Sequence, residues 1–173
     1  MLDVKTPESA AEWGQVRALM RAFLAWHRER HLQDIHLVDS YFDAAAFDAE
    51  LATLPGPYAP PNGRLLLARL KGRAVGCVAL KDLGGRRCEM KRMFVCVDAQ
   101  GQGVGRALAT AIVDQARSAG YRRMLLDTSI RQLEAQALYR SLGFKPSDPD
   151  MSLPRPLRDW LVFMALDLSA AAI

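Results

Sequence analysis

The stretch from residue 98 to residue 112, DAQGQGVGRALATAI, places three glycines in a short polar segment directly before a helical pattern. The first backbone N–H groups of a helix have no partner inside the helix, and the helix dipole adds positive potential there. Glycine, which has no Cβ, lets such a backbone approach an anion closely. Arg106, one turn into the expected helix, adds a full positive charge. The chemistry indicated by these residues is the binding of a phosphate or pyrophosphate group.

Two other nucleotide-binding loops also use a glycine-rich turn of this kind. Asp127, at the end of the next expected strand, stands near the position of the ribose-binding carboxylate in a dinucleotide-binding fold. The spacing excludes that fold, because the third glycine of GxGxxG would fall on Arg106 or Leu108. A Walker loop is excluded because no GKS or GKT follows. A turn that binds no ligand remains an alternative when the stretch is considered by itself.

The elements that must position this loop follow from hydrophobic periodicity and from the glycine and proline residues. We predict strands over 2–6, 64–70, 74–83, 88–97, 123–127 and 159–168, a further strand opening at Gly143, and helices over 9–31, 41–54, 103–119 and 131–142. The three strands between 64 and 97 have connections short enough for hairpins, so we expect an antiparallel meander. The strands over 88–97 and 123–127, joined by a helix, form a βαβ unit and should be parallel.

Length and composition restrict the class of protein. The 173 residues suit a single domain over 1–173, and no apolar run approaches the roughly 18 residues of a membrane span. The N-terminal segment MLDVKTPESA lacks the plan of a signal peptide, and three cysteines without CxxC spacing indicate neither a disulfide framework nor a zinc site. We therefore expect a cytoplasmic protein without a metal or a membrane partner. The net charge of +4 suits a small anionic ligand and is too weak to indicate nucleic acid.

Two motifs and the order of the elements together resemble a known family. QGQGVG fits the pattern Q/R-x-x-G-x-G/A, with Gln100, Gly103 and Gly105 at the defined positions, and AQALYRSLGF follows about thirty residues later. With this order of strands and helices, the chain resembles the GNAT superfamily of acetyl-CoA-dependent N-acetyltransferases. The resemblance implies an α+β (mixed α/β) fold of three layers. Its sheet would be mixed, mostly antiparallel and of about six to seven strands, with about four flanking helices and the parallel βαβ unit carrying the cofactor loop.

The resemblance assigns one set of residues to coenzyme A. In this family the amides of the loop hold the pyrophosphate, and the preceding strand diverges from its parallel neighbour to admit the pantetheine arm. The matching positions are Met93, Phe94, Val95, Gln100, Gly101, Gln102, Gly103, Val104, Gly105 and Arg106. The N–H of Val95 would donate to the thioester carbonyl, most strongly when its oxygen becomes negative in the tetrahedral state.

Glu89 is the catalytic base that the resemblance implies. Many family members have a glutamate eleven residues before the first motif position, and Glu89 stands eleven residues before Gln100. A base is needed because an alkyl amine, with a pKa near about 10, is mostly protonated at neutral pH. Glu89 would remove that proton through a water molecule. The alternative is an ion pair with Lys91, two residues on and on the same strand face, which would make the glutamate a weaker base.

Tyr139, within ALYRSLGF, matches the position where the family often has a tyrosine facing the thioester sulfur. It would protonate the departing thiolate or donate a hydrogen bond to it. The alternative is a half-buried aromatic residue on an amphipathic helix. Many members have asparagine seven residues before this tyrosine, where it contacts the cofactor, whereas this chain has Gln132. The longer amide either reaches the same group or misses it, so Gln132 is left out of the predicted site residues.

The acceptor is less directly indicated. In the family it is contacted by segments that correspond here to about 25–42, 55–63 and 146–158, and their mixed charge and proline content favour a shaped pocket for a small molecule. These segments contain Asp34, Asp39, Tyr41, Tyr58, Arg155 and Arg158. We therefore expect acetyl transfer from acetyl-CoA to the primary amine of a small molecule. Alternatives are acetylation of a protein N-terminus or lysine, and a non-catalytic coenzyme A sensor or interaction module, against which the presence of Glu89 and Tyr139 counts. An exposed final strand would suit a homodimer.

Three further residues invite a chemical interpretation that we do not adopt. His27 and His31 are spaced to bind a metal, but they lack the HExxH pattern and a third ligand. His27 lies along the apolar stripe of its helix, so we expect a packed histidine. Cys96 is close to the cofactor strand, but direct transfer needs no acyl-cysteine, and small buried cysteines are ordinary core residues.

Overall fold

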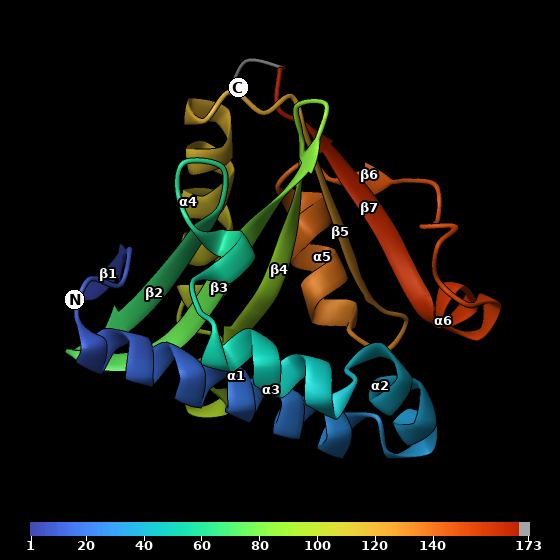
Figure 1. Ribbon diagram of the computed structural model, residues 1–173, viewed down its shortest axis with the longest axis horizontal. Coiled ribbons are helices and arrows are strands. Elements are labelled where there is room, and N and C mark those ends of the chain that lie inside the picture. The colour runs from blue at the N-terminus through green and yellow to red at the C-terminus, as the bar shows by residue number, and fades with distance from the viewer. Residues whose placement is uncertain (170–173) are drawn as a thin grey trace.

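A computed structural model describes residues 1–169, so the last four residues of the expected domain 1–173 lie outside the described part. Its centre is a seven-stranded sheet with the order β1-β2-β3-β4-β5-β7-β6. The strands are β1 (Leu2–Lys5), β2 (Arg64–Leu70), β3 (Arg73–Gly84), β4 (Arg87–Val95), β5 (Arg123–Ser129), β6 (Lys145–Pro146) and β7 (Leu161–Asp167). β4 and β5 are parallel, and every other neighbouring pair is antiparallel (Figure 1).

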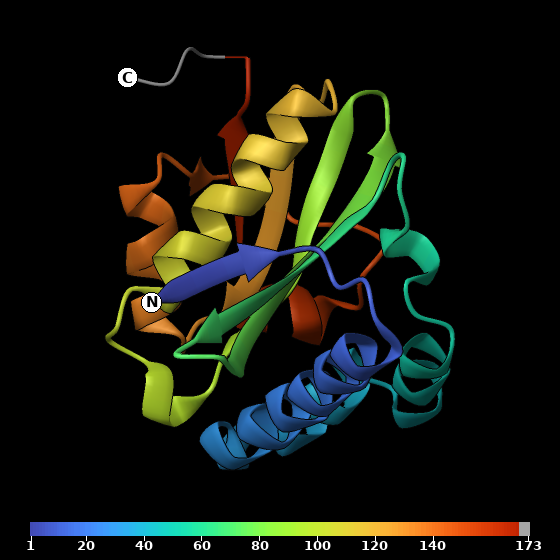
Figure 2. The same ribbon diagram turned by 90° about the vertical axis from the view of Figure 1, so that its left-hand side faces the viewer.

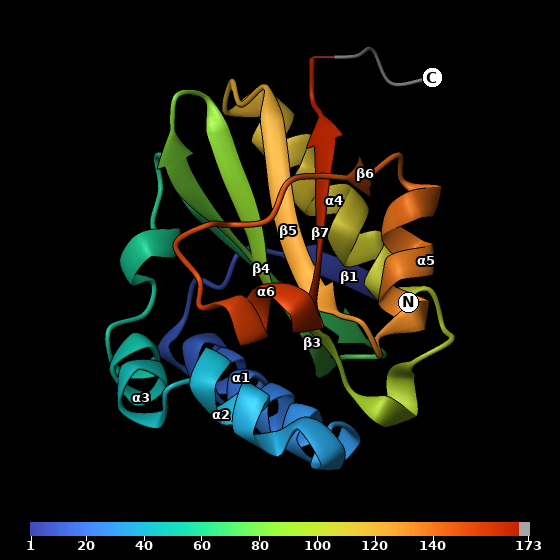
Figure 3. The ribbon, with the colours of Figure 1, turned by 90° about the vertical axis from the view of Figure 1, so that its right-hand side faces the viewer.

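The helices form a layer on each face of the sheet (Figures 2 and 3). They are α1 (Ala10–Arg30), α2 (Ile35–Tyr41), α3 (Ala44–Ala52), α4 (Val104–Ser118), α5 (Leu133–Ser141) and α6 (Arg155–Trp160). α4 and α5 cover one face, and α1, α2, α3 and α6 pack on the other. None of these helices combines the length and the apolar character that a membrane span requires, within the described part of the chain.

The apolar strand β2 shows how one sequence supplies both cores. Along RLLLARL, Leu66 and Ala68 are buried under α4, whereas Leu65 and Leu67 are buried under α1 and α3. A strand covered on both faces needs apolar residues at every position rather than at alternate ones. The run of leucines therefore marks β2 as an interior strand of the sheet.

β4 and β5 separate soon after they pair. Their register holds only from Arg87 opposite Arg123 to Glu89 opposite Leu125, although both strands continue for several residues. β4 also carries a bulge, because Lys91 and Phe94 pair with Ala79 and Cys77 on β3 and leave an extra residue between them. The strand therefore bends away from β5, and the sheet opens between its two parallel strands.

Arg92 is the residue at this bulge, and its side chain fixes the bend. Its backbone has a positive φ of 57°, which is uncommon for a residue with a Cβ. The guanidinium group forms an ion pair with Glu50 at 2.9 Å and lies 5.4 Å from the ring centroids of Phe42 and Phe47. Contacts with α3 and with the residue after α2 thus compensate for the backbone strain and hold the opening of the sheet.

The predicted fold class, the antiparallel meander and the parallel βαβ unit are confirmed. The expectation of about four helices was too low, because α2 and α6 were not predicted. Both are short, and their stability comes from packing against each other and against α1 rather than from local periodicity. The expectation of an exposed final strand was wrong: β7 lies between β5 and β6, so the two-residue β6 forms the edge.

Candidate active site

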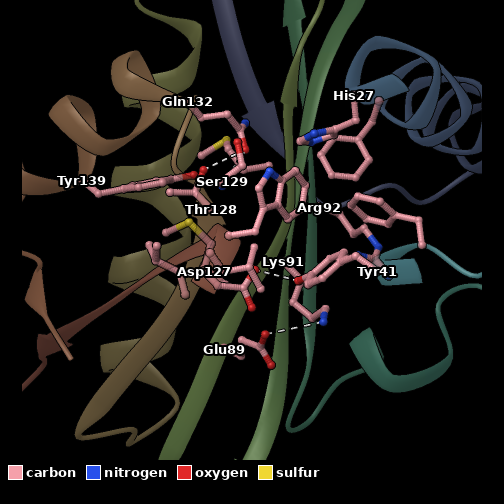
Figure 4. Close-up of a pocket in the computed structure, with 17 residues that line it drawn as sticks. His27, Tyr41, Glu89, Lys91, Arg92, Asp127, Thr128, Ser129, Gln132 and Tyr139 are labelled. Carbon is pink, nitrogen blue, oxygen red and sulfur yellow. Dashed lines mark hydrogen bonds and ion pairs between the residues drawn. The ribbon is translucent and has the colours of Figure 1, made fainter. Parts of the chain in front are cut away.

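Three hollows meet at the opening between β4 and β5. The first, the loop groove, lies between the end of β4, the glycine loop and α5, and Met93 and Gln132 line both this groove and the next hollow. The second, the central pocket, fills the opening itself (Figure 4). Glu89 and Asp127 line both the central pocket and a third hollow, the outer pocket, which the 147–151 segment covers. Neighbouring hollows share these wall residues, so the three adjoin one another in a row across the sheet, and we call this row the passage.

The glycine loop presents free backbone donors to the first of these hollows. Gly101 and Gly103 have φ values of 75° and 81°, a conformation that glycine adopts without strain. No side chain caps α4 at Gly103, and the backbone N–H groups of residues 101–104 have no acceptor among the described residues. The loop is therefore an open helix N-terminus of the kind that binds phosphate.

Eight of the ten residues predicted to bind the cofactor line the loop groove. They are Met93, Phe94, Val95, Gln100, Gly101, Gly103, Gly105 and Arg106. The other two residues of the set, Gln102 and Val104, do not line it: the Gln102 amide donates to the Asp98 carbonyl at 3.0 Å, and the Val104 side chain is buried in the core. Their predicted role involves only the main chain, so the placement of these side chains is compatible with it.

Val95 has the orientation that its predicted role requires. The N–H of Cys96 donates to the carbonyl of Val75 at 2.8 Å, and Val95 is the partner of Gly76. Val95 therefore occupies a non-hydrogen-bonded position of the β3–β4 ladder, and its own N–H and C=O point away from β3. Since β5 has already diverged, this N–H faces the opening rather than another strand.

Glu89 lies at the junction of the central and outer pockets, on the face of the sheet that carries α1. Its neighbours Cys88 and Met90 point into the opposite core, as alternation along a strand requires. Lys91 Nζ lies 3.5 Å from Glu89 Oε1, and each side chain is 20% exposed. The expected ion pair is thus present, but it is long and leaves the second carboxylate oxygen without a protein partner among the described residues.

Tyr139 lines the central pocket from α5. Its ring is buried, with a centroid 5.7 Å from that of Phe144, and its hydroxyl makes no hydrogen bond with the described residues. Burial, and then the negative charge of Asp127, raise the pKa of Tyr139 well above its usual value. The hydroxyl therefore stays protonated and can donate a hydrogen bond to a group bound in the pocket.

Gln132 lines the loop groove and the central pocket, but part of its side chain has a local role. Its Oε1 accepts hydrogen bonds from Thr128 Oγ1 at 2.8 Å and from the Ser129 N–H at 3.1 Å. These bonds fix the turn from β5 into α5. The amide nitrogen has no partner among the described residues, so only that half of the side chain is available to a ligand.

Tyr41 and Asp127, two further residues of the central pocket, contact each other. The Tyr41 hydroxyl, on α2, donates to Asp127 Oδ1 at 2.6 Å. Six residues were named from the sequence in the segments expected to contact the acceptor. Among these six, Tyr41 alone lines the central pocket, because it ends α2, which packs beside the opening of the sheet. From the sequence, Asp127 was considered only as a ribose ligand. Its position at the end of a strand expected to be parallel to the strand of Glu89 could have indicated that it belongs to the site.

His27 is packed, as expected, yet it also lines the central pocket. Its side chain is 5% exposed, and burial, followed by the nearby His31 and Arg92, lowers the pKa of His27 to about 3. The ring is therefore neutral at physiological pH, and its Nδ1 is buried without a hydrogen-bond partner. The next histidine, His31, has both ring nitrogens engaged, with the His27 carbonyl at 2.8 Å and Ser129 Oγ at 2.6 Å.

The fold and site define an acetyl-CoA-dependent acyltransferase. The chain belongs to the acetyltransferase (GNAT) family, which it matches over residues 37–144. It is 40% identical over 124 residues to an uncharacterised N-acetyltransferase of Schizosaccharomyces pombe, covering 70% of this chain and 74% of the relative. It is 41% identical over 117 residues to an IAA acetyltransferase of Azospirillum brasilense, covering 67% and 74%. A crystal structure from Klebsiella pneumoniae, named for acyl-CoA N-acyltransferase activity, superposes with a TM-score of 0.69 at 27% identity and 97% coverage of both chains.

Replacement of Gly103 by valine should weaken the binding of coenzyme A at least about tenfold. A β-branched residue is strongly disfavoured at a φ of 81°, so the loop must shift and its N–H groups lose their alignment. Each hydrogen bond to a charged group contributes about 1.5–3 kcal/mol, so the loss of one suffices for this effect. Isothermal titration calorimetry with coenzyme A measures it.

Gly120 supplies the matched control for this variant. It has a φ of 86°, lies at the far end of α4, and has open space where a Cβ would stand, as Gly103 does. Gly120→Val should lower stability to a similar extent and leave coenzyme A binding unchanged. Normal affinity in the Gly103 variant would show that the loop is a turn without a ligand.

Proposed function

We propose that this protein transfers an acetyl group from acetyl-CoA to the primary amine of a small molecule by direct attack. One observation carries the proposal: the open glycine loop and Val95 line the loop groove, Tyr139 lines the central pocket, and Glu89 lines both the central and the outer pocket, which adjoin in a row. A donor thioester and an acceptor amine that entered from opposite ends would meet in the central pocket.

The residues of the loop groove suit coenzyme A. The unpartnered N–H groups of the loop would hold the pyrophosphate, and the opening beside β4 would receive the pantetheine arm in the place of a strand. The Arg106 guanidinium donates to Ser141 Oγ at 2.9 Å and so spans from α4 to α5 beside the groove. It adds positive charge at the site where the phosphates would lie.

The residues of the central pocket suit the transfer itself. Glu89 would take a proton from the acceptor ammonium through a water molecule, which frees the nitrogen lone pair to attack the carbonyl carbon. The Val95 N–H would stabilise the oxyanion of the tetrahedral state. As the C–S bond breaks, Tyr139 would donate a hydrogen bond to the thiolate. Its raised pKa favours this hydrogen bond over full proton transfer, because a thiol normally titrates near about 8.5.

A small-molecule acceptor is supported by the enclosure of the passage. Phe23, Phe42 and Trp160 form an apolar wall around the central pocket, and the segment between β6 and α6 crosses the outer face of the sheet (Figure 3). A long peptide groove would need an open face there. The Azospirillum brasilense relative, named for a small molecule, supports the same choice.

Release of free thiol from acetyl-CoA across a panel of small amines, peptides with free N-termini and lysine peptides tests the proposed function. We expect turnover with at least one small primary amine and less with the peptides. Preferred turnover of a peptide would assign a protein acceptor. Thermal stabilisation by coenzyme A without turnover of any amine would instead assign a non-catalytic sensor.

A further inference from the structure

Asp127 has no role in the reaction described above, although it lines both the central and the outer pocket. We propose that Asp127 binds the ammonium group of the incoming acceptor beside Glu89 and thereby selects amines that arrive as cations. The inference rests on the proposed function, since it names the group that receives the acceptor of that reaction. Asp127 would be a substrate-binding residue, with Glu89 as the base.

The geometry of the sheet brings the two carboxylates together. Glu89 on β4 is in register with Leu125 on β5, and Asp127 follows two residues later on the same face. Met124 and Leu126 point into the opposite core, which confirms the face on which Asp127 lies. Figure 4 shows the carboxylates of Glu89 and Asp127 close together in the opening, the first reached by Lys91 and the second by Tyr41.

The two carboxylates differ in their partners. Glu89 has a cation, Lys91, at 3.5 Å. Asp127 has only the neutral hydroxyl of Tyr41 and forms no ion pair with any residue of the described range 1–169. A partly buried carboxylate without a cation is destabilised, and a second carboxylate nearby adds repulsion. An ammonium group bound at this point would relieve both.

The surrounding charges leave this position open to a ligand cation. The groups that face Asp127 are Tyr41 from α2, Tyr139 from α5, and Glu89, Lys91 and Arg92 from β4. The outer pocket adds the charged residues Arg87, Arg123, Asp148 and Asp150. The two cations nearest to Asp127 are already paired, Lys91 with Glu89 and Arg92 with Glu50. Because the outer pocket has mixed charge, selection for a cation would occur at Asp127 itself.

His27 gives independent support for a polar ligand in the same pocket. Its neutral ring is 5% exposed, and Nδ1 has no hydrogen-bond partner within the described residues. Figure 4 shows the His27 ring in the wall of the pocket. A buried polar atom without a partner is costly, so such atoms usually meet a ligand or water. The pocket is thus prepared for a ligand that carries hydrogen-bonding groups.

Asp127 keeps its charge throughout the reaction. The acceptor R–NH₃⁺ would form an ion pair with Asp127, and one of its protons would pass through water to Glu89. The freed lone pair forms the C–N bond, and the C–S bond breaks with its electron pair on sulfur. A second proton passes from the nitrogen to this thiolate, which leaves as the free thiol. The positive charge of the acceptor disappears in this sequence, so the neutral amide product loses its attraction to Asp127 and can leave.

The decisive variant is Asp127→Asn, which removes the charge but keeps an oxygen that can accept from Tyr41. With the best amine of the panel, KM should rise about 10- to 100-fold while kcat changes less than tenfold, as expected for the loss of ground-state binding. Asp82→Asn is the matched control, since it removes a carboxylate from β3, outside the three hollows, and keeps an oxygen that can accept from the Gly84 N–H. It should leave KM within about threefold of the original value.

A binding measurement separates this inference from turnover. The N,N-dimethyl analogue of the amine is a cation that cannot form a stable amide, and the corresponding alcohol is neutral. The unmodified protein should bind the cation at least about tenfold more tightly than the alcohol, and Asp127→Asn should bind the two alike. Equal binding by the unmodified protein, or equal losses in the Asp127 and Asp82 variants, would overturn the inference.

Stability provides a readout that needs no acceptor at all. Burial, with the charge of Glu89, raises the pKa of Asp127, although the Tyr41 hydrogen bond and the nearby Lys91 and Arg92 oppose the shift. A carboxyl whose pKa is raised by folding stabilises the folded state while the pH is below its pKa in the unfolded chain, 3.8. This contribution to stability is lost as the pH rises through its pKa in the folded protein.

In the absence of ligands, Asp127→Asn should therefore have a Tm a few degrees above that of the unmodified protein at pH 8. The gap should close as the pH falls below about 4. A pH-independent decrease in Tm would assign Asp127 a structural role and contradict the proposal, even if the panel yielded no substrate. If only the proposed function is wrong, no amine of the panel will be acetylated, but the pH-dependent difference in Tm between Asp127→Asn and the unmodified protein will remain.

Discussion

Replacement of Glu89 by glutamine should lower kcat/KM by about 10²–10⁴-fold, the usual contribution of a general base. Glutamine has nearly the same shape but cannot take a proton from the water that would bridge to the acceptor. The 20% exposure of the Glu89 side chain and its place between the central and outer pockets make such a water accessible. Steady-state kinetics across the pH range measures the effect, and the acidic limb of the profile should disappear.

Lys91→Met distinguishes the catalytic role of Glu89 from a structural ion pair. Both variants break the 3.5 Å contact, but only Glu89→Gln removes the base. Lys91→Met should therefore change kcat/KM by less than about tenfold, in line with the small energy of a partly exposed pair. Matched losses in the two variants, with matched decreases in stability, would show that the pair is structural.

Replacement of Tyr139 by phenylalanine should lower kcat about 10- to 150-fold and change the KM for acetyl-CoA much less. This range corresponds to a hydrogen bond to a charged group, about 1.5–3 kcal/mol, which would be formed with the departing thiolate. The ring would keep its contact with Phe144, and the hydroxyl has no partner in the described part of the chain, so folding should be preserved. Stopped-flow detection of free thiol in a single turnover isolates the step.

Tyr121→Phe is the matched control for Tyr139→Phe. Tyr121 is also buried, but its hydroxyl donates to the Asn62 carbonyl at 2.7 Å, away from the passage. Its loss should lower stability and leave kcat unchanged. An unaltered kcat in Tyr139→Phe would remove Tyr139 from the catalytic group and leave it as a packing residue.

The elements of regular length were predictable because their signals are local. Helix α4 was expected over 103–119 and spans Val104–Ser118, since an apolar stripe and two glycines mark it. β2 was placed over 64–70, as observed. The short helices α2 and α6 were missed because seven and six residues carry too little periodicity, and tertiary packing stabilises them.

The acceptor side of the site was less predictable than the cofactor side for the same reason. The glycine loop, Glu89 and Tyr139 belong to motifs of fixed spacing, so their proximity could be expected before the structure was known. Tyr41 approaches Asp127 across 86 positions of sequence, and no spacing rule connects them. Only the packing of α2 against the open sheet brings the two side chains together.

By itself the sequence determined the family, the order of the long elements and the segment that would bind a pyrophosphate, because each depends on backbone preferences within a few residues. Tertiary structure alone decided where the sheet opens, which hydroxyl meets Asp127, and which carboxylate lacks a cation. These features depend on a bulge held by Arg92 and on contacts between distant segments. The burial and the electrostatic environment of a site depend on residues from many distant parts of the sequence, so they are defined only once the chain has folded.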